Sequence, residues 1–95
     1  MALAPGLVAE EITRSRGGGE VHVLTLAPGA QGRKPPFATK RAEAVVVMSG
    51  LLEVRVGEAK ETLQTGDGLV LSTEPLSGWR NPGPQETRVL WVLLP

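Results

Sequence analysis

Short apolar stretches, separated by turns that contain glycine and proline, divide this sequence from end to end and limit its fold more than any other feature. Several stretches are rich in β-branched residues or alternate apolar with polar side chains, as strands with one buried face do. Turn signals recur roughly every ten residues, a spacing typical of all-β sandwiches and barrels. The predicted strands are Glu20–Leu26, Glu43–Met48, Leu51–Val56, Ala59–Leu63, Leu69–Leu71 and Thr87–Leu94.

The segment Val8–Thr13 fits a helix or an opening strand equally well, because it ends in the β-branched residues Ile12 and Thr13. No stretch has a convincing helical period, and no internal repeat is present. The 95 residues are expected to form one small domain with a thin core. Within this single domain, 1–95, residues 1–19 are expected to form an N-terminal strand or arm.

Composition excludes several classes of function. Ten Lys and Arg residues balance ten Asp and Glu residues, so no net positive field would attract nucleic acid or a membrane. The apolar runs are too short to span a bilayer, and the N-terminus lacks the basic region of a signal peptide. Without cysteine, no disulfide or thiolate metal site can form, and we expect a cytoplasmic protein. More Arg than Lys and proline-rich turns also fit a thermophilic source.

Two of the predicted strands are apolar on both faces. Ala44–Met48 and Val89–Leu94 do not alternate, whereas an antiparallel strand with one wet face should. Something must therefore cover the outer face of these strands. The chain is too short to supply another layer, so we expect a homodimer.

The spacing of glycines and polar residues resembles the two sequence motifs of the cupin superfamily. Glu43 and Gly50 stand at the separation found in the second half of the first motif, and Gly66 and Asn81 match the ends of the second motif. The resemblance covers about residues 20 to 95 and is closest to the small single-domain cupins. It implies an all-β fold, a cupin-like antiparallel β-barrel or jelly roll, also described as a double-stranded β-helix.

The same alignment implies that the metal ligands of this superfamily are missing. Its metal-binding members hold iron, manganese, zinc or nickel with three His and one Glu inside the barrel. Only Glu43 stands at one of these positions. The first two histidine positions fall on Phe37 and Thr39, or on Pro36 and Ala38 with a longer spacing, and Ser77 takes the third. In the second motif, Ser72 and Glu74 also replace the proline and the glycine.

A divalent transition ion needs several imidazoles or carboxylates that converge on it, and neutral hydroxyls do not hold it alone. We therefore predict no metal and no cofactor. His22, the only histidine, is expected to have a surface or hydrogen-bonded structural role. Glu43 is expected to point into the barrel, where a carboxylate must be hydrogen-bonded, paired or protonated. Glu43 could belong to a structural polar network or act as an acid–base group, and the sequence leaves both roles open.

The barrel interior is the predicted ligand pocket, and no catalytic residue is assigned. Trp79 is expected to face this cavity, either to stack on a ligand or to fill space. The basic cluster around Pro35, which comprises Arg33, Lys34, Lys40 and Arg41, could bind an anionic ligand or simply be solvated. The predicted pocket residues are Phe37, Thr39, Glu43, Val45, Val54, Ser77, Trp79 and Asn81.

The favoured function is therefore a metal-free cupin that binds a small molecule or acts as a regulatory module, without catalysis of its own. One alternative is a cupin enzyme, such as an isomerase, epimerase or oxygenase-like protein with an atypical site, for example one built from Glu43 and His22. The other alternative is a purely structural dimer that acts through its surface.

Overall fold

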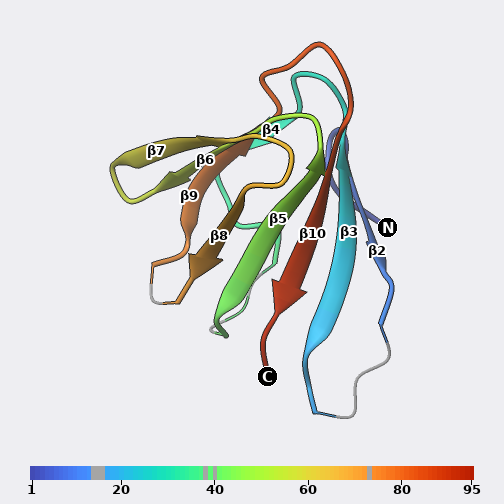
Figure 1. The fold of residues 1–95 in the computed structure, drawn as a ribbon, viewed down its shortest axis with the longest axis vertical. Helices are drawn as coiled ribbons and strands as arrows, with labels where there is room; N and C mark the ends of the chain where they lie inside the picture. Colours follow the sequence, from blue (N-terminus) through green and yellow to red (C-terminus); the bar gives the residue numbers. More distant parts are fainter. Residues whose placement is uncertain (14–16, 38, 40, 73) are drawn as a thin grey trace.

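The computed structural model describes residues 1–13, 17–37, 39, 41–72 and 74–95, and within these ranges it contains ten strands and no helix (Figure 1). No described segment could cross a membrane as a helix. The strands are β1 (Ala2–Ala4), β2 (Leu7–Glu11), β3 (Glu20–Leu26), β4 (Gln31–Gly32), β5 (Glu43–Ser49), β6 (Leu52–Val56), β7 (Ala59–Leu63), β8 (Gly68–Leu71), β9 (Leu76–Arg80) and β10 (Thr87–Leu93).

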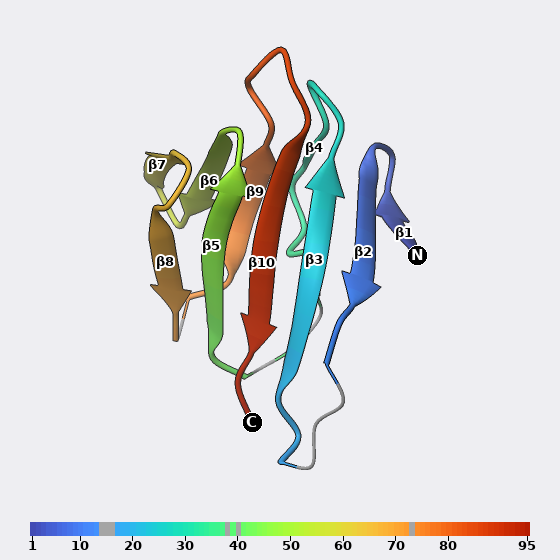
Figure 2. The same ribbon diagram turned by 45° about the vertical axis from the view of Figure 1, so that its right-hand side comes forward.

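The strands form two antiparallel sheets that face each other. The larger sheet has the order β1-β2-β3-β10-β5-β8, and the smaller one has the order β4-β9-β6-β7. Figure 2 shows the long strands of the larger sheet side by side, with the smaller sheet behind them. The centre of the larger sheet joins strands that are distant in the sequence, since β10 pairs with both β3 and β5. The predicted all-β, antiparallel architecture is confirmed.

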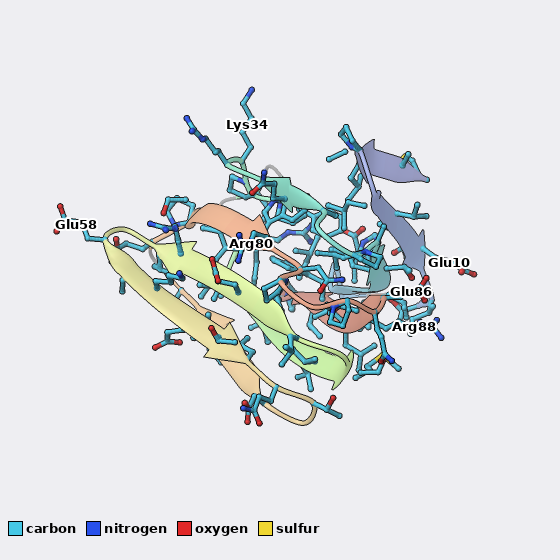
Figure 3. All side chains as sticks on the ribbon, turned by 90° about the horizontal axis from the view of Figure 1, so that it is seen from above. Glu10, Lys34, Glu58, Arg80, Glu86 and Arg88 are labelled. Atoms are coloured by element: carbon cyan, nitrogen blue, oxygen red, sulfur yellow. The ribbon has the colours of Figure 1, made fainter. Side chains whose placement is uncertain are left out.

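The core lies between the two sheets because the inward faces of the strands carry the large apolar side chains. In β10, Val89, Trp91 and Leu93 are all buried, while the residues between them face outward. Val45 and Val47 of β5 follow the same alternation. Figure 3, viewed from above, shows side chains filling the space between the sheets, while the labelled Glu10, Lys34 and Glu58 point away from it. Burial of this inner face is the main stabilising term available to the domain.

Three strands were not predicted from the sequence. β1 and β4 contain three and two residues, which is too short for any periodicity, and β9 is interrupted by Gly78. The sequence left open whether Val8–Thr13 is a helix or a strand. The structure has a strand there, since Leu7–Glu11 pairs with β3 along its whole length. Tertiary pairing, rather than local preference, decides each of these cases.

The strand β9 contains a bulge that determines which way its side chains face. Arg55 of β6 pairs with Gly78, but the next residue, Val56, pairs with Leu76. Ser77 is therefore the extra residue and has no cross-strand partner. Its side chain is exposed, and its Oγ donates a hydrogen bond to the carbonyl of Gly57 at 3.1 Å. The predicted interior position of Ser77 is wrong, because a bulge moves one residue out of the alternating pattern.

One end of the barrel is closed by a buried side-chain amide. Asn81 is fully buried, and its Nδ2 donates to the carbonyls of Leu26, Ala27 and Gln85 at 2.8–3.2 Å. Its Oδ1 accepts a hydrogen bond from the backbone N–H of Gly83. The amide thus connects the turn after β3 to the turn before β10. Because every hydrogen-bonding group of this side chain is used, we interpret Asn81 as structural.

The outer face of the larger sheet is apolar and uncovered. Val46 and Met48 of β5 are 37% and 44% exposed, and Val70 of β8 is 68% exposed. Leu90 and Val92 of β10, which lie between these strands and β3, are only half-buried. The two strands predicted to be apolar on both faces therefore have one face in the core and one face in solvent. An apolar sheet face of this extent is typical of an interaction surface.

Two turn glycines have the positive φ predicted from their positions. Gly50 has a φ of 87° and Gly66 a φ of 89°, in the left-handed region that other residues enter only at a cost. Their surroundings differ. A Cβ on Gly50 would lie 2.5 Å from Oγ1 of Thr87 and 2.9 Å from the carbonyl oxygen of Glu86, whereas a Cβ on Gly66 would have no neighbour within 4 Å.

We expect Gly66→Ala to lower the free energy of unfolding by about 1 kcal/mol, because it introduces backbone strain only. Gly50→Ala should lower it by about 2–3 kcal/mol, because the same strain is joined by a clash with backbone atoms that cannot move aside. Urea denaturation of the two variants measures the difference. Equal losses would show that the contact with Thr87 and Glu86 is relieved without cost.

Candidate functional site

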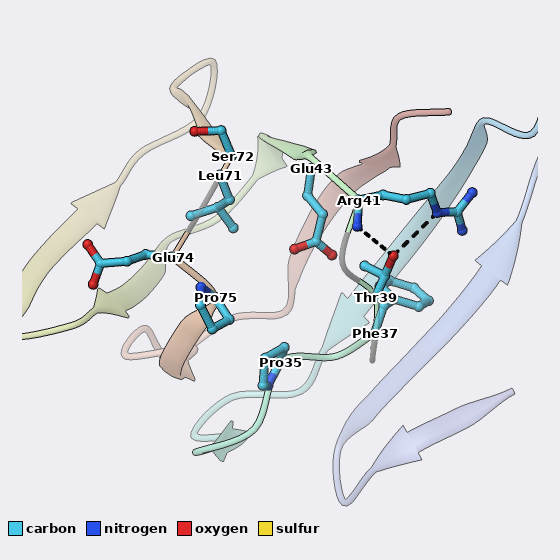
Figure 4. Close-up of a pocket in the computed structure, with 9 residues that line it drawn as sticks. All are labelled: Pro35, Phe37, Thr39, Arg41, Glu43, Leu71, Ser72, Glu74 and Pro75. Carbon is cyan, nitrogen blue, oxygen red and sulfur yellow. Dashed lines mark hydrogen bonds between the residues drawn. The ribbon is translucent and has the colours of Figure 1, made fainter.

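A pocket opens at the end of the barrel opposite Asn81, where β3 and β5 begin and β10 ends (Figure 4). Its volume is about 240 Å³. One wall is the segment that leads into β5, and the other wall is the segment that follows β8 and leads into β9. The lining residues are Pro35, Phe37, Thr39, Arg41, Glu43, Leu71, Ser72, Glu74 and Pro75.

Glu43 supplies the carboxylate of this pocket. It is the first residue of β5 and pairs with Leu93 and Leu71 on the two neighbouring strands. The residue is 5% exposed, and Oε1 accepts a hydrogen bond from Nε1 of Trp91 at 3.1 Å. Burial raises the pKa of Glu43 above its ordinary value of 4.5, although the Trp91 hydrogen bond and the nearby charge of Arg41 act in the opposite direction.

Arg41 lies beside Glu43, but its guanidinium is engaged elsewhere. Its NH2 donates to Oε2 of Glu20 at 2.7 Å, its NH1 donates to the carbonyl of Gly18, and its Nε donates to Oγ1 of Thr39 at 3.3 Å. The hydrogen bonds from Arg41 and His22 hold the pKa of Glu20 below its ordinary value. The side chain of Arg41 therefore connects the segment that precedes β5 to the start of β3.

Three aromatic rings, those of His22, Phe37 and Trp91, lie in contact between the Arg41–Glu20 ion pair and the core. The ring centroid of Phe37 lies 4.5 Å from that of His22 and 6.2 Å from that of Trp91. Nε2 of His22 lies 3.3 Å from Oε1 of Glu20. The side chain of His22 is only 12% exposed. Its surroundings therefore agree with the expected hydrogen-bonded structural role.

The residues at the motif positions do not fit the metal that the superfamily resemblance implies. Phe37 has no donor atom, and Oγ1 of Thr39 already accepts hydrogen bonds from Arg41. Ser77 lies on the outer face of the other sheet, so it cannot join Glu43 at all. One carboxylate without imidazole partners is an incomplete set for a transition ion.

A separate group of ligand-type atoms lies at the same end of the barrel. Glu11, Glu20 and His22 each place one such atom within 4.8 Å of the others. Both oxygens of Glu20 are already engaged, one by Arg41 and one by His22, and Glu11 is exposed. We therefore interpret this group as the pairing of Glu20 with Arg41 and His22, with Glu11 nearby on β2.

The eight predicted pocket residues separate into four groups. Phe37, Thr39 and Glu43 line the pocket. Val45, Val54 and Trp79 face inward but are packed in the core, and Nε1 of Trp79 donates to the carbonyl of Lys34 at 2.8 Å. Asn81 closes the opposite end of the barrel. Ser77 lies outside.

The predicted pocket residues did not include six of the lining residues, although Arg41 was among the basic residues considered for an anionic ligand. The six are Pro35, Arg41, Leu71, Ser72, Glu74 and Pro75. A signal existed for Arg41, because it shares its strand parity with Glu43. The wall that contains Leu71, Ser72, Glu74 and Pro75 lies between two strands of different sheets. No periodicity in the sequence indicates such a crossing. Of the basic cluster, Arg41 is engaged by Glu20, and Lys40, together with the alternative histidine position Ala38, lies outside the described residues.

Comparisons with known proteins agree with this architecture. The family model for the cupin domain (Cupin_2) matches residues 22–93. No curated protein matches the sequence. Solved structures that are 18–22% identical to this chain have the same fold.

One of these structures is the cupin domain of an XRE-family transcriptional regulator from Enterobacter cloacae, with 22% identity, 95% of this chain and 98% of that chain covered, and a TM-score of 0.81. A cupin 2 conserved barrel protein from Salinispora arenicola is 18% identical, with 98% and 79% covered and a TM-score of 0.80. An HTH_3-family transcriptional regulator from Vibrio cholerae is 18% identical, with 95% and 52% covered and a TM-score of 0.77.

The raised pKa of Glu43 predicts a pH-dependent contribution to stability. Between pH 4.5, the ordinary value, and the raised pKa, the folded protein holds a proton that the unfolded chain has released. The free energy of unfolding contributed by Glu43 should therefore fall as the pH rises through this window.

Glu43→Gln keeps the shape of the side chain and removes the titration. Its free energy of unfolding, minus that of the wild type, should increase as the pH rises from 4.5 and become constant above the raised pKa. Urea denaturation of both proteins at a series of pH values measures this difference. A difference that stays constant over the whole series would contradict the assignment.

Proposed function

We propose that this chain, which belongs to the cupin family, binds a small molecule in the pocket beside Glu43 and has no metal-dependent activity of its own. The observation that supports this function is one buried carboxylate in an open cavity whose walls combine apolar and polar side chains. Such a combination of a few placed polar groups and apolar surface is typical of small-molecule sites.

An acid–base enzyme is the main alternative, and the surroundings of Glu43 give it less support. Acid–base chemistry generally needs a second positioned group. Glu74 also lines the pocket, but its Oε2 lies against Gly57, where an added Cβ would approach it to 2.6 Å. In Figure 4 the carboxylate of Glu74 points away from Glu43. Arg41 is held by Glu20, so neither group is positioned to act with Glu43.

A regulatory role is consistent with the kind of protein in which similar domains occur. Two structures with this fold belong to transcriptional regulators, one from Enterobacter cloacae and one from Vibrio cholerae. At these identities the likeness shows the fold alone, so the ligand-sensing role is our proposal for this chain. The cytoplasmic location that we expect from the sequence also stays a prediction.

A blocked pocket should lose ligand binding. Ser72 is exposed at the pocket, so Ser72→Trp places an indole across it, and Ser77→Trp makes the same change on the outer face of the other sheet. A set of amines, carboxylic acids and sugars of roughly ten non-hydrogen atoms matches the cavity. In thermal-shift measurements, some of these compounds should stabilise the wild type and Ser77→Trp but not Ser72→Trp.

If no compound shows this pattern, the pocket is not a binding site. Elemental analysis of protein purified without chelator tests the metal-dependent alternative on the same samples. We expect well below one transition metal ion per chain. A stoichiometric metal that Glu43→Gln removes would replace our proposal with the enzyme reading.

We also propose that the protein acts as a homodimer joined through the outer face of the larger sheet. Its exposed apolar residues lie on neighbouring strands, β8, β5 and β10. The strands β2, β3, β10, β5 and β8 contain 30 residues together. At about 3.3 Å per residue and about 4.8 Å between strands, they give roughly 475 Å² of flat area. Two such faces together have roughly 950 Å² of flat area, which corresponds to a small interface at the weak end of the range for protein–protein contacts.

Val46→Glu places a charge in the centre of this face and should convert the dimer into a monomer, because an unpaired buried carboxylate is strongly unfavourable. Thr62→Glu changes another exposed β-branched residue, on the smaller sheet, and should leave the dimer intact. Light scattering at micromolar concentration distinguishes the 10.0 kDa chain from its dimer. A monomeric wild type would exclude this interface.

A further inference from the structure

The carboxylate of Glu43 is only half satisfied by the protein. Oε1 accepts the hydrogen bond from Trp91, but no described group donates to Oε2. Among the described residues, no fully buried side-chain nitrogen or oxygen is left without a partner. Oε2 must therefore retain contact with solvent, and Glu43 reaches solvent through the pocket that it lines. The pocket thus presents one free acceptor atom at its inner end.

The described charges around the pocket favour a positive ligand. Glu43 and Glu74 line it, and Arg41 is the single cation among the described lining residues. The charge of Arg41 is balanced by Glu20 at 2.7 Å. Three carboxylates and one guanidinium leave a net charge of −2 when all are ionised. An anion would have to compete with Glu20 for Arg41, whereas a cation meets Oε2 without displacing any contact.

The remaining walls suit the organic part of such a ligand. Phe37, Leu71 and Pro75 present apolar surface on opposite sides of Glu43 (Figure 4). Phe37 also supplies an aromatic ring, which attracts ammonium groups as well as apolar groups. The volume of about 240 Å³ corresponds to roughly eight water molecules, so the ligand has about eight to ten non-hydrogen atoms.

We propose that the pocket binds a small organic cation, with its ammonium group at Oε2 of Glu43 and its apolar part between Phe37 and Leu71. This inference rests on the proposed binding function and adds the chemical class of the ligand. The ammonium group would complete the hydrogen bonding of a carboxylate that burial disfavours, and for this reason charge, rather than shape alone, should determine selectivity.

Three probes of the same size test this class. Benzylamine is a cation at neutral pH, benzyl alcohol is its neutral counterpart, and benzoate is an anion. In isothermal titration calorimetry, benzylamine should bind at least about tenfold more tightly than either of the others, because only it forms a charge-assisted hydrogen bond with Glu43. Ser72→Trp should abolish this binding, and Ser77→Trp should leave it unchanged.

Glu43→Gln tests the assigned atom without removing the acceptor for Trp91. Its affinity for benzylamine should fall by about tenfold, to that for benzyl alcohol. In the wild type the affinity for benzylamine should increase as the pH rises from 4.5 through the raised pKa of Glu43. Other groups near the pocket also carry or can acquire charge, namely Glu20, His22, Arg41 and Glu74. The Glu43→Gln variant retains all of them, so its affinity for benzylamine should not increase over this pH range if Glu43 is responsible.

Preferential binding of benzoate or benzyl alcohol, lost in Ser72→Trp, would overturn the ligand class and leave the binding function standing. Equal affinity of wild type and Glu43→Gln for benzylamine would overturn the role of Oε2. If none of the three probes, and none of the compounds in the wider set, distinguishes the wild type from Ser72→Trp, both the ligand class and the binding function are wrong.

Discussion

The hydrogen bond between Trp91 and Glu43 connects the fold of this protein to its candidate site. Trp91 lies on the inner face of β10, the strand that pairs with both β3 and β5 in the larger sheet. Its indole N–H reaches Oε1 of Glu43 at 3.1 Å, so a core aromatic residue holds the pocket carboxylate. A buried Trp needs an acceptor, and a buried carboxylate needs a donor. Trp91 and Glu43 meet each other's need for a hydrogen-bond partner. The second carboxylate oxygen, Oε2, receives no hydrogen bond from the described residues and is available in the pocket.

The two ends of the barrel use polar residues in opposite ways. At one end, Asn81 makes hydrogen bonds to three carbonyls and one N–H, and Thr87 donates to the carbonyl of Leu51. The side chains of Asn81 and Thr87 thus find their partners within the chain. At the other end, no group of the described residues donates to the second carboxylate oxygen of Glu43. A fully satisfied network rigidifies a fold, whereas a partly satisfied one can bind something else.

Two separate physical features keep the residues at the motif positions from forming the metal site that the superfamily resemblance implies. Phe37 and Thr39 lie near Glu43, as the motif alignment implies, but their side chains are not metal ligands. The third position, Ser77, is displaced to the outside by the bulge in β9. A histidine at position 77 would therefore still not face Glu43. Restoring the missing residue types would not restore the site, because register as well as chemistry has changed.

The sequence by itself determined the all-β character and most of the longer strands, the turns at Gly50 and Gly66, and the inward direction of Glu43. These properties follow from local rules, such as alternation, β-branching and the conformational freedom of glycine. It also brought Phe37, Thr39 and Glu43 together, because their spacing along one segment is short. Only the tertiary structure decided the other wall of the pocket, the capture of Arg41 by Glu20 and the outward position of Ser77. Each of these depends on which strands meet across the two sheets, and such long-range pairing leaves no periodic trace in the chain.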